Sequence, residues 1–292
     1  MGTKVISISN RAPAIPVDLG RHMRKTRGGK IRTGVRSKSG TVLKLTMFVL
    51  AALTIYGFYT FDYGTINFAD AVSRTLENIR IMFSRPQLRF NTYSGIAIQL
   101  LITLSLGVLA TIFGAIIAFF AALLSAKNIA NAKVANVIKG IFAAVRAVPS
   151  ILWILIFTVG AGLGGTAAVA GLTLHSAAYL VKAYAESIEE MDSGPIEALR
   201  ASGAGFWQIV FQAVIPASIS YMTAWTFLRF EINFINAIAM GAAAGAGGIG
   251  FDLFMAGSFY FDLRELGFIT YLIIAAVIIL ELLATKIKRS VK

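Results

Sequence analysis

Six long apolar stretches constrain the fold of this 292-residue chain more than any other feature of its sequence. A hydrocarbon core of about 30 Å is crossed by about 20 apolar helical residues, whose backbone polar groups must all be paired within the segment. The stretches that meet this requirement are 41–61, 94–125, 137–160, 167–185, 209–241 and 266–287. We therefore expect an all-α integral membrane protein of about six transmembrane helices, with the longest two tilted, protruding or broken.

The basic residues are distributed unevenly around these stretches. Of the 27 Lys and Arg residues, ten lie in residues 1–40, which contain a single acid, Asp18. Because cytoplasmic loops carry an excess of Lys and Arg, we place both termini inside, which puts twenty basic residues on the inner side and five on the outer side. Residues 1–40 then form a basic, disordered cytoplasmic tail, residues 41–93 hold the first helix and an external connection, and residues 94–292 form the membrane core.

The basic tail has the charge to bind either anionic lipid headgroups or nucleic acid. Since this excess charge is confined to one segment next to the first membrane helix, contact with membrane lipid is favoured, and no nucleic-acid partner is expected. On the opposite side of the membrane, we expect Asp262 and Glu265 to lie on a solvated outer rim.

Several kinds of chemistry are disfavoured by the residue types present. The chain has no cysteine and only two histidines, His22 and His175, so no metal site is expected. No phosphate-binding loop of the form Gly-x-x-x-x-Gly-Lys-Ser/Thr occurs, so ATP is not expected to bind to this chain. No clustered histidines or paired carboxylates suit catalysis either, so we predict no catalytic residue and disfavour a membrane enzyme.

The polar connection between the fourth and fifth stretches carries the signals of a short helix. Gly194 can serve as its N-cap, with Pro195 at the first helical position and Glu197 in the first turn, where it favours the helix dipole. Gly203 can end the helix. Residues 194–204 are therefore predicted to form a helix of about two turns outside the membrane, held by a docking surface because so short a helix is marginal in water.

This connection resembles the coupling loop of ABC importer permeases. The run Glu197-Ala198-Leu199-Arg200-Ala201-Ser202-Gly203-Ala204, followed by Ile215-Pro216, is similar to the EAA loop of that family, with Leu199 where alanine is usual. The resemblance implies that the chain docks onto a separate ATPase subunit, which binds the ATP and Mg, so that no cofactor is held here. The residues that it assigns to ATPase coupling are Glu197, Ala198, Leu199, Arg200, Gly203 and Pro216.

Further segments look like the phosphonate-importer permeases over residues 94–292. These are Leu174-His175-Ser176, Gly194-Pro195-Ile196-Glu197, Arg229-Phe230-Glu231-Ile232-Asn233 and the glycine-rich run at 245–250. One departure is Ile235, where many members of that group carry an arginine. The resemblance therefore implies a type I importer transmembrane domain, with the exact substrate less well defined than the family.

Arg229, Glu231 and Asn233 are polar residues inside the fifth stretch, where burial in lipid is costly. Arg229 and Asn233, four residues apart, share a helix face, and Glu231 points nearly the opposite way. One interpretation is that Arg229 and Asn233 line the pathway of an anionic substrate while Glu231 anchors a neighbouring helix or the other subunit; the alternative is one structural polar network. Arg146 either extends to the inner interface or marks a gate, since Pro149 can kink its helix.

Residues 245–250 also match the spacing Gly-x-Gly-x-x-Gly. A dinucleotide site of this kind needs a strand and a helix in a βαβ unit, which the pattern of this chain does not contain. Irregular backbone at membrane depth must lie against protein or water. We therefore expect Gly247 and Gly248 to form a tight turn or helix break at the outer end of the fifth helix, at the translocation pathway or its gate.

The resemblance implies a permease subunit in the cell membrane that carries phosphonate or a related phosphorus oxyanion. Its implied partners are a second copy of itself, ABC ATPase subunits on the inside and a solute-binding protein on the outside. Alternatives of the same class are permeases for phosphate, phosphite or methionine. A secondary transporter or channel is disfavoured, because Glu231 is the only acid at a central position and the coupling loop would have no purpose in it.

Overall fold

The computed structural model describes residues 24–25, 31–32, 38–61, 64 and 67–290, which divide into two compact units, Met1–Phe68 and Ala69–Lys292. In the first unit, β1 (Arg24–Lys25) pairs antiparallel with β2 (Ile31–Arg32), and α1 (Lys38–Thr60) follows. The predicted disorder of the tail concerns residues that lie almost entirely outside the described ones.

Helix α1 has the properties of a membrane helix. It is apolar on all sides, and none of its described residues from Gly40 to Thr60 is buried within the structure. The hydroxyls of Thr46 and Thr54 donate to carbonyls four residues earlier in the same helix, at 3.0 and 2.8 Å. A helix that satisfies its own polar groups and exposes apolar side chains all round is suited to lipid.

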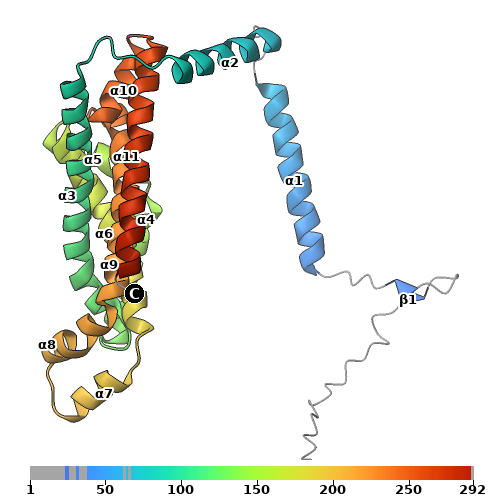
Figure 1. Cartoon of the computed structure of the whole chain (residues 1–292). Coiled ribbons are helices and arrows are strands. Elements are labelled where there is room, and N and C mark those ends of the chain that lie inside the picture. Colours follow the sequence, from blue (N-terminus) through green and yellow to red (C-terminus); the bar gives the residue numbers. More distant parts are fainter. Residues whose placement is uncertain (1–23, 26–30, 33–37, 62–63, 65–66, 291–292) are drawn as a thin grey trace, which may run out of the picture. The chain divides into compact units, whose positions relative to one another are not determined.

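The second unit is a bundle of helices, drawn in Figure 1. Its elements are α2 (Phe68–Ser84, whose first residue belongs to the first unit), α3 (Tyr93–Ser125), α4 (Ala132–Ala147), α5 (Ser150–Ala161), α6 (Gly165–Glu189), α7 (Gly194–Ala201), α8 (Phe206–Ile209), the π-helix η2 (Val210–Val214), α9 (Ile215–Ala244), α10 (Ile249–Ser258) and α11 (Leu263–Ser290). Helix α6 is central, because it packs against α3, α4, α5 and α9. The short helices α7 and α8 lie at one end of the bundle and α10 at the other (Figure 1).

Among the described residues, four helical segments are long and apolar enough to cross a membrane: Gly40–Thr60, Tyr93–Ser125, Phe206–Ala244 and Leu263–Lys286. The predicted stretch 137–160 falls on two helices, α4 and α5, which meet at a bend of 88° and together pass the same test. The predicted stretch 167–185 is the buried helix α6, which does not pass it. The all-α membrane fold is therefore confirmed, while six spans stay a prediction.

Pro149 causes the bend between α4 and α5. Its ring removes the backbone N–H that would continue the helix, which leaves carbonyls of the last turn of α4 without helical partners. The indole Nε1 of Trp153 donates to the Val145 carbonyl at 3.0 Å. A side chain thus takes the place of the backbone N–H that Pro149 lacks.

Small residues allow α3 to approach its neighbours closely, as the pattern of its sequence indicates. A Cβ atom built on Gly114 would lie 2.7 Å from Cβ of Ser176, and one on Gly107 would lie 3.3 Å from the backbone of Phe234. Any larger residue would push α6 or α9 away. Packing through small residues is the usual way in which helices associate in lipid.

At the start of α11, the structure shows that the prediction of a solvated rim was wrong for Asp262 and Glu265. Glu265 is fully buried and Asp262 is only 9% exposed. The Glu265 carboxylate accepts hydrogen bonds from the backbone N–H groups of Arg89, Phe90 and Asn91 and from the Asn91 side chain, at 2.8–3.2 Å. Its role is therefore to hold the α2–α3 connection against the start of α11, which no local sequence signal distinguishes from an exposed acid.

Candidate functional site

A buried polar network joins α3, α6 and α9. Arg229 is 2% exposed and Asn233 is fully buried. Arg229 Nε donates to Ser176 Oγ at 3.0 Å, and Ser176 Oγ lies 2.9 Å from Asn233 Oδ1. The amide of Asn233 donates to Thr111 Oγ1 at 2.8 Å. The two residues of α9 that share a helix face are thus brought to one cluster, to which sequence reasoning did not assign Thr111 or Ser176.

Arg229 is a buried cation whose neighbours are neutral. Its guanidinium carbon lies 5.3 Å from the centre of the Tyr179 ring, and Nη2 is buried with no hydrogen-bond partner in the described part of the chain. No carboxylate of a described residue forms an ion pair with it. Buried charges are normally paired, so an unneutralised cation at this depth favours the approach of an anion.

Glu231 lies apart from this cluster, on the side of α9 that faces α11. Together with Glu281 it lines a cavity of about 130 Å³ between the two helices. Glu231 Oε1 is buried, and no hydrogen-bond partner for it occurs among the residues that the structure describes. The structure therefore does not join all three polar residues of the predicted motif into one network.

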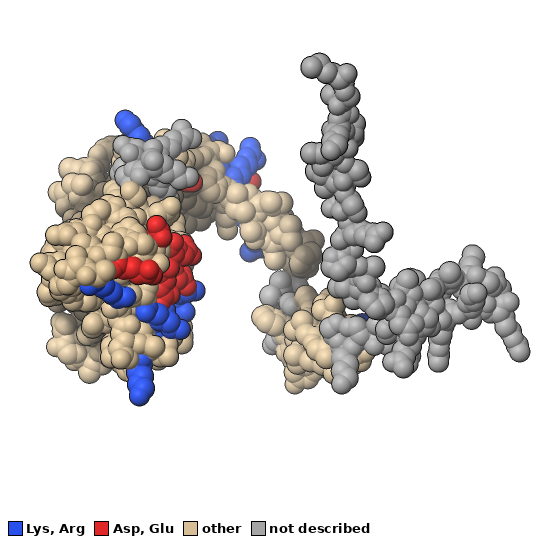
Figure 2. Space-filling view, turned by 90° about the horizontal axis from the view of Figure 1, so that it is seen from below, with Lys and Arg blue, Asp and Glu red and all other residues tan. Residues whose placement is uncertain are grey.

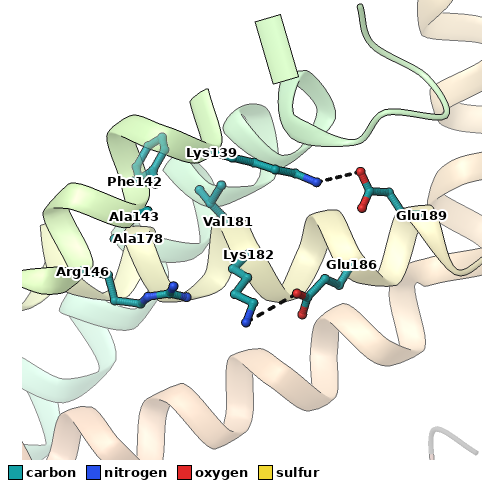
Figure 3. Close-up of a pocket in the computed structure, with 9 residues that line it drawn as sticks. All are labelled: Lys139, Phe142, Ala143, Arg146, Ala178, Val181, Lys182, Glu186 and Glu189. Atoms are coloured by element: carbon teal, nitrogen blue, oxygen red, sulfur yellow. Dashed lines mark hydrogen bonds and ion pairs between the residues drawn. The ribbon is translucent and has the colours of Figure 1, made fainter. Parts of the chain in front are cut away.

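Arg146 lies at the elbow, beside a second and larger cavity, of about 230 Å³, between α4 and α6 (Figure 3). We call this cavity the α4–α6 pocket. It is lined by Lys139, Phe142, Ala143 and Arg146 of α4 and by Ala178, Val181, Lys182, Glu186 and Glu189 of α6. Three cations therefore share the pocket with two carboxylates.

Two ion pairs account for four of these five charges. Lys139 Nζ lies 2.8 Å from Glu189 Oε1, and Lys182 Nζ lies 3.5 Å from Glu186 Oε1. Burial alone would raise the pKa of the Glu189 carboxyl, but hydrogen bonds from Lys139 and from the Lys127 amide outweigh it and hold that pKa below its ordinary value. Arg146 extends toward Lys182 in Figure 3, and within the described ranges it has no acidic partner.

A sequence signal was present for the polar face of α6 that forms one side of this pocket, but not for its pairing with α4. His175, Tyr179, Lys182 and Glu186 are spaced by four, three and four residues, which places them on one face of a helix. Figure 2, a view onto the end of the bundle, shows Asp and Glu side chains gathered beside Lys and Arg on one side of it.

The predicted coupling helix is α7. Its N-cap is Ser193 rather than Gly194, and Pro195 lies in the first turn as expected. Ile196 is buried in a cluster that includes Ile209 and Val210, which supplies the packing that so short a helix needs. Glu197 accepts a hydrogen bond from Ser193 Oγ at 2.9 Å.

The end of α7 is set by Gly203. This residue has φ +82°, a left-handed conformation, and its N–H donates to the Arg200 carbonyl at 3.0 Å while the Ala204 N–H donates to the Leu199 carbonyl at 3.0 Å. Arg200 Nη2 donates to the Asn128 carbonyl at 2.9 Å, which ties α7 to the α3–α4 connection. At this end of the bundle, the exposed residues of α7 include Glu197, Ala198 and Arg200.

Pro216 lies at the start of α9, directly after the π-helix Val210–Val214. The Ile215 N–H donates to the Val210 carbonyl, five residues earlier. The wider turn leaves room for the proline ring, which in a regular α-helix would clash with the carbonyl four residues before it.

The glycine run closes a tight turn between α9 and α10. Gly247 and Gly248 have φ of +75° and +76°. The Gly248 N–H donates to Gln99 Oε1 at 3.0 Å, and a Cβ on Gly248 would collide with the Thr103 hydroxyl of α3. The run is a turn rather than a dinucleotide loop, as predicted. Among the described residues, no group of His, Cys, Asp or Glu could hold a metal ion.

Comparison with known proteins agrees with this architecture. Residues 110–291 match the family model described as "Binding-protein-dependent transport system inner membrane component". The phosphate-import permease protein PhnE of Mycolicibacterium smegmatis is 33% identical over 153 residues, which are 52% of this chain and 29% of that protein. The phosphite transport system permease protein PtxC of Stutzerimonas stutzeri is 31% identical over 204 residues, 70% of this chain and 74% of that protein.

A solved structure, described as an inward-facing conformation of the MetNI methionine ABC transporter, superposes with a TM-score of 0.60 at 25% identity, over 65% of this chain and 93% of that one.

Proposed function

Because the chain belongs to the family of binding-protein-dependent transport system inner membrane components, we propose that it is the permease subunit of an ATP-driven importer for phosphonate or a related phosphorus oxyanion. The chain is a multi-pass membrane protein of that family. The names of two relatives, a phosphate-import and a phosphite permease, support a phosphorus oxyanion as the substrate class.

The environment of Arg229 is the observation that supports an anionic substrate. Its charge is buried between α6 and α9 with a serine hydroxyl and a tyrosine ring as neighbours. In low dielectric such a charge attracts an anion strongly. Asn233 and Ser176 add hydrogen-bonding groups that suit phosphoryl oxygens, so Arg229 and Asn233 are proposed to line the pathway, with Gly247 and Gly248 shaping its outer end and Arg146 its inner end.

The exposed surface of α7 supports a coupling role for this helix. Its buried side is anchored by Ile196, and its exposed residues Glu197, Ala198 and Arg200 are proposed to enter a cleft on an ATPase subunit. ATP and Mg are proposed to bind on that subunit. Two copies of this chain would form one pathway, a solute-binding protein would deliver the substrate from outside, and ATP-driven closure of the ATPases would draw the two coupling helices together and open the pathway outward.

A methionine permease is the second candidate, favoured by the likeness to the methionine transporter structure. Methionine is a zwitterion with an apolar side chain, so its recognition needs a carboxylate partner for the ammonium group as well as a cation. Within the described ranges, the cluster around Arg229 contains no acid, and Glu231 faces the opposite side of α9. The phosphorus oxyanion is therefore the better fit.

Co-purification tests the importer assignment. The tagged chain is expressed in its native membrane, and the proteins recovered with it are identified by mass spectrometry. We expect an ATPase subunit that is lost on Glu197→Ala and retained on Glu77→Ala, a matched exposed glutamate on α2. Recovery of the folded chain alone in mild detergent would contradict the assignment. Uptake of methylphosphonate rather than methionine by cells that carry the complete transporter would identify the substrate.

A further inference from the structure

A polar stripe runs along one face of α6, from the buried network to the end of the bundle that carries α7. It consists of His175, Tyr179, Lys182 and Glu186. The ring of Tyr179 contacts Arg229, and Lys182 and Glu186 line the α4–α6 pocket. The stripe thus connects the buried cation of α9 with the α4–α6 pocket.

The α4–α6 pocket lies between this stripe and one face of α4. Lys139, Phe142 and Arg146 follow one another at intervals of three and four residues, so they lie on one face of α4. A volume of about 230 Å³ accommodates several water molecules or one small oxyanion. Its two ion pairs leave the charge of Arg146 in excess, so the pocket carries a net positive charge.

Two buried polar atoms, Arg229 Nη2 and His175 Nδ1 at the start of the stripe, lack hydrogen-bond partners in the described part of the structure. Buried polar atoms are rarely left without hydrogen bonds, and an orphaned group on a buried cation calls for an explanation. An oxyanion that passes along the stripe would satisfy both in turn.

We propose that the α4–α6 pocket is a second oxyanion site, in which Arg146 and Lys182 bind the phosphoryl oxygens of the substrate after it leaves Arg229. This inference rests on the proposed function and extends it to the exit side of the pathway. Glu186 and Glu189 neutralise two of the three cations, which keeps the affinity low. Weak binding is what an exit site needs, because a transported ion must be held firmly enough to enter and loosely enough to leave.

The absence of cysteine from the whole chain makes a direct test simple. Ala143 lines the pocket, and its neighbour Ala144 is exposed without lining it. Ala143→Cys and Ala144→Cys therefore form a matched pair that removes no charge. The full-length chain with its co-purifying partners is placed in discs of zwitterionic lipid, and each thiol is modified with an anionic and a cationic methanethiosulfonate reagent. The ratio of the two rates cancels the intrinsic reactivity of each thiol.

We expect this ratio to favour the anionic reagent about tenfold more at Ala143→Cys than at Ala144→Cys, because a positively charged cleft concentrates anions. Adding Arg146→Gln should remove most of that preference, whereas Lys133→Gln, an exposed lysine outside the pocket, should leave it unchanged. Methylphosphonate or inorganic phosphate in millimolar amounts should slow modification of Ala143→Cys alone.

Equal ratios at the two positions, or no protection by methylphosphonate, would overturn the site. Protection by an anionic phospholipid in the disc, with none by methylphosphonate, would also overturn it, because the pocket would then hold a lipid headgroup. Neither readout requires transport, so failure of the importer assignment, seen as loss of ATPase co-purification or of uptake, is distinguishable from failure of this site.

Discussion

The guanidinium of Arg229 lies over the ring of Tyr179, with 5.3 Å between the guanidinium carbon and the ring centre, and this contact joins α9 to the polar stripe of α6. Trp225, one helical turn before Arg229, meets the same ring edge to face at a centroid distance of 6.2 Å. The tyrosine is thereby fixed between the buried cation and an aromatic neighbour. Its ring, rather than its hydroxyl, faces the charge.

Two substitutions of Tyr179 test the contributions of its ring and its hydroxyl separately. Tyr179→Phe keeps the ring and should leave stability nearly unchanged, whereas Tyr179→Leu removes a desolvated cation–π contact and should cost about 2 kcal/mol. Thermal unfolding of the purified chain in one detergent measures both. Equal losses for the two variants would show that the hydroxyl, not the ring, supports Arg229.

Replacing Gly203 by alanine should destabilise the protein through the backbone conformation alone. A Cβ at this position meets no atom within 4 Å, yet φ is +82°. Gly203→Ala should therefore cost about 1 to 2 kcal/mol and weaken ATPase co-purification. Gly140→Ala is the matched control, because Gly140 also has open space but lies within α4, where alanine should stabilise the helix by about 1 kcal/mol. Equal effects at the two glycines would contradict the explanation.

Glu265→Gln should loosen the corner where the α2–α3 connection packs against the start of α11. The substituted amide keeps one acceptor oxygen and turns an NH₂ group toward backbone donors, so a loss of roughly 2 to 4 kcal/mol is expected. Exposed Glu77→Gln should change stability little, because its partner Arg80 is 3.7 Å away and both are solvated. Limited trypsin digestion provides the structural readout, since cleavage after Arg89 should accelerate only in Glu265→Gln.

The same corner should weaken in acid through Asp262. Burial would raise the pKa of this carboxyl, but hydrogen bonds from the Glu265 and Arg264 amides and from Arg89 hold it below its ordinary value. Its contribution to stability is therefore complete above the ordinary pKa of about 3.9 and is lost as the pH falls through the lower pKa of the folded state. Between about pH 4.5 and 2.5, Tm should fall further in the unmodified chain than in Asp262→Asn, which cannot titrate. Parallel curves would argue against this role.

The sequence predicted those features that depend on local signals. The apolar stretches marked the helices, Pro195 and Gly203 marked α7, and the glycine run marked the turn after α9. The spacing along the helix also predicted that Arg229 and Asn233 share one face of it and that Glu231 lies on the other. Each of these follows from helical periodicity or from the backbone preferences of one residue type.

Features that depend on contacts between distant segments could not be predicted in this way. Glu265 is buried where its carboxylate accepts from the Phe90 amide, 175 residues earlier in the chain. The residues near Glu265 in the sequence, Asp262 among them, give no sign of this burial. The α4–α6 pocket likewise needs two helices to face each other. Pro149 allowed a kink, but the bend of 88° became visible only in three dimensions.

The π-helix Val210–Val214 sets the direction around the helix axis in which the side chains of α9 point. Successive residues of an α-helix are about 100° apart around the axis, so one residue more or less in the turn rotates all later side chains by that angle. With the turn as it is, Arg229 and Asn233 face Ser176 and Thr111. Deleting a single residue from it would swing them off α6 by about 100° while leaving every member of the network in the sequence.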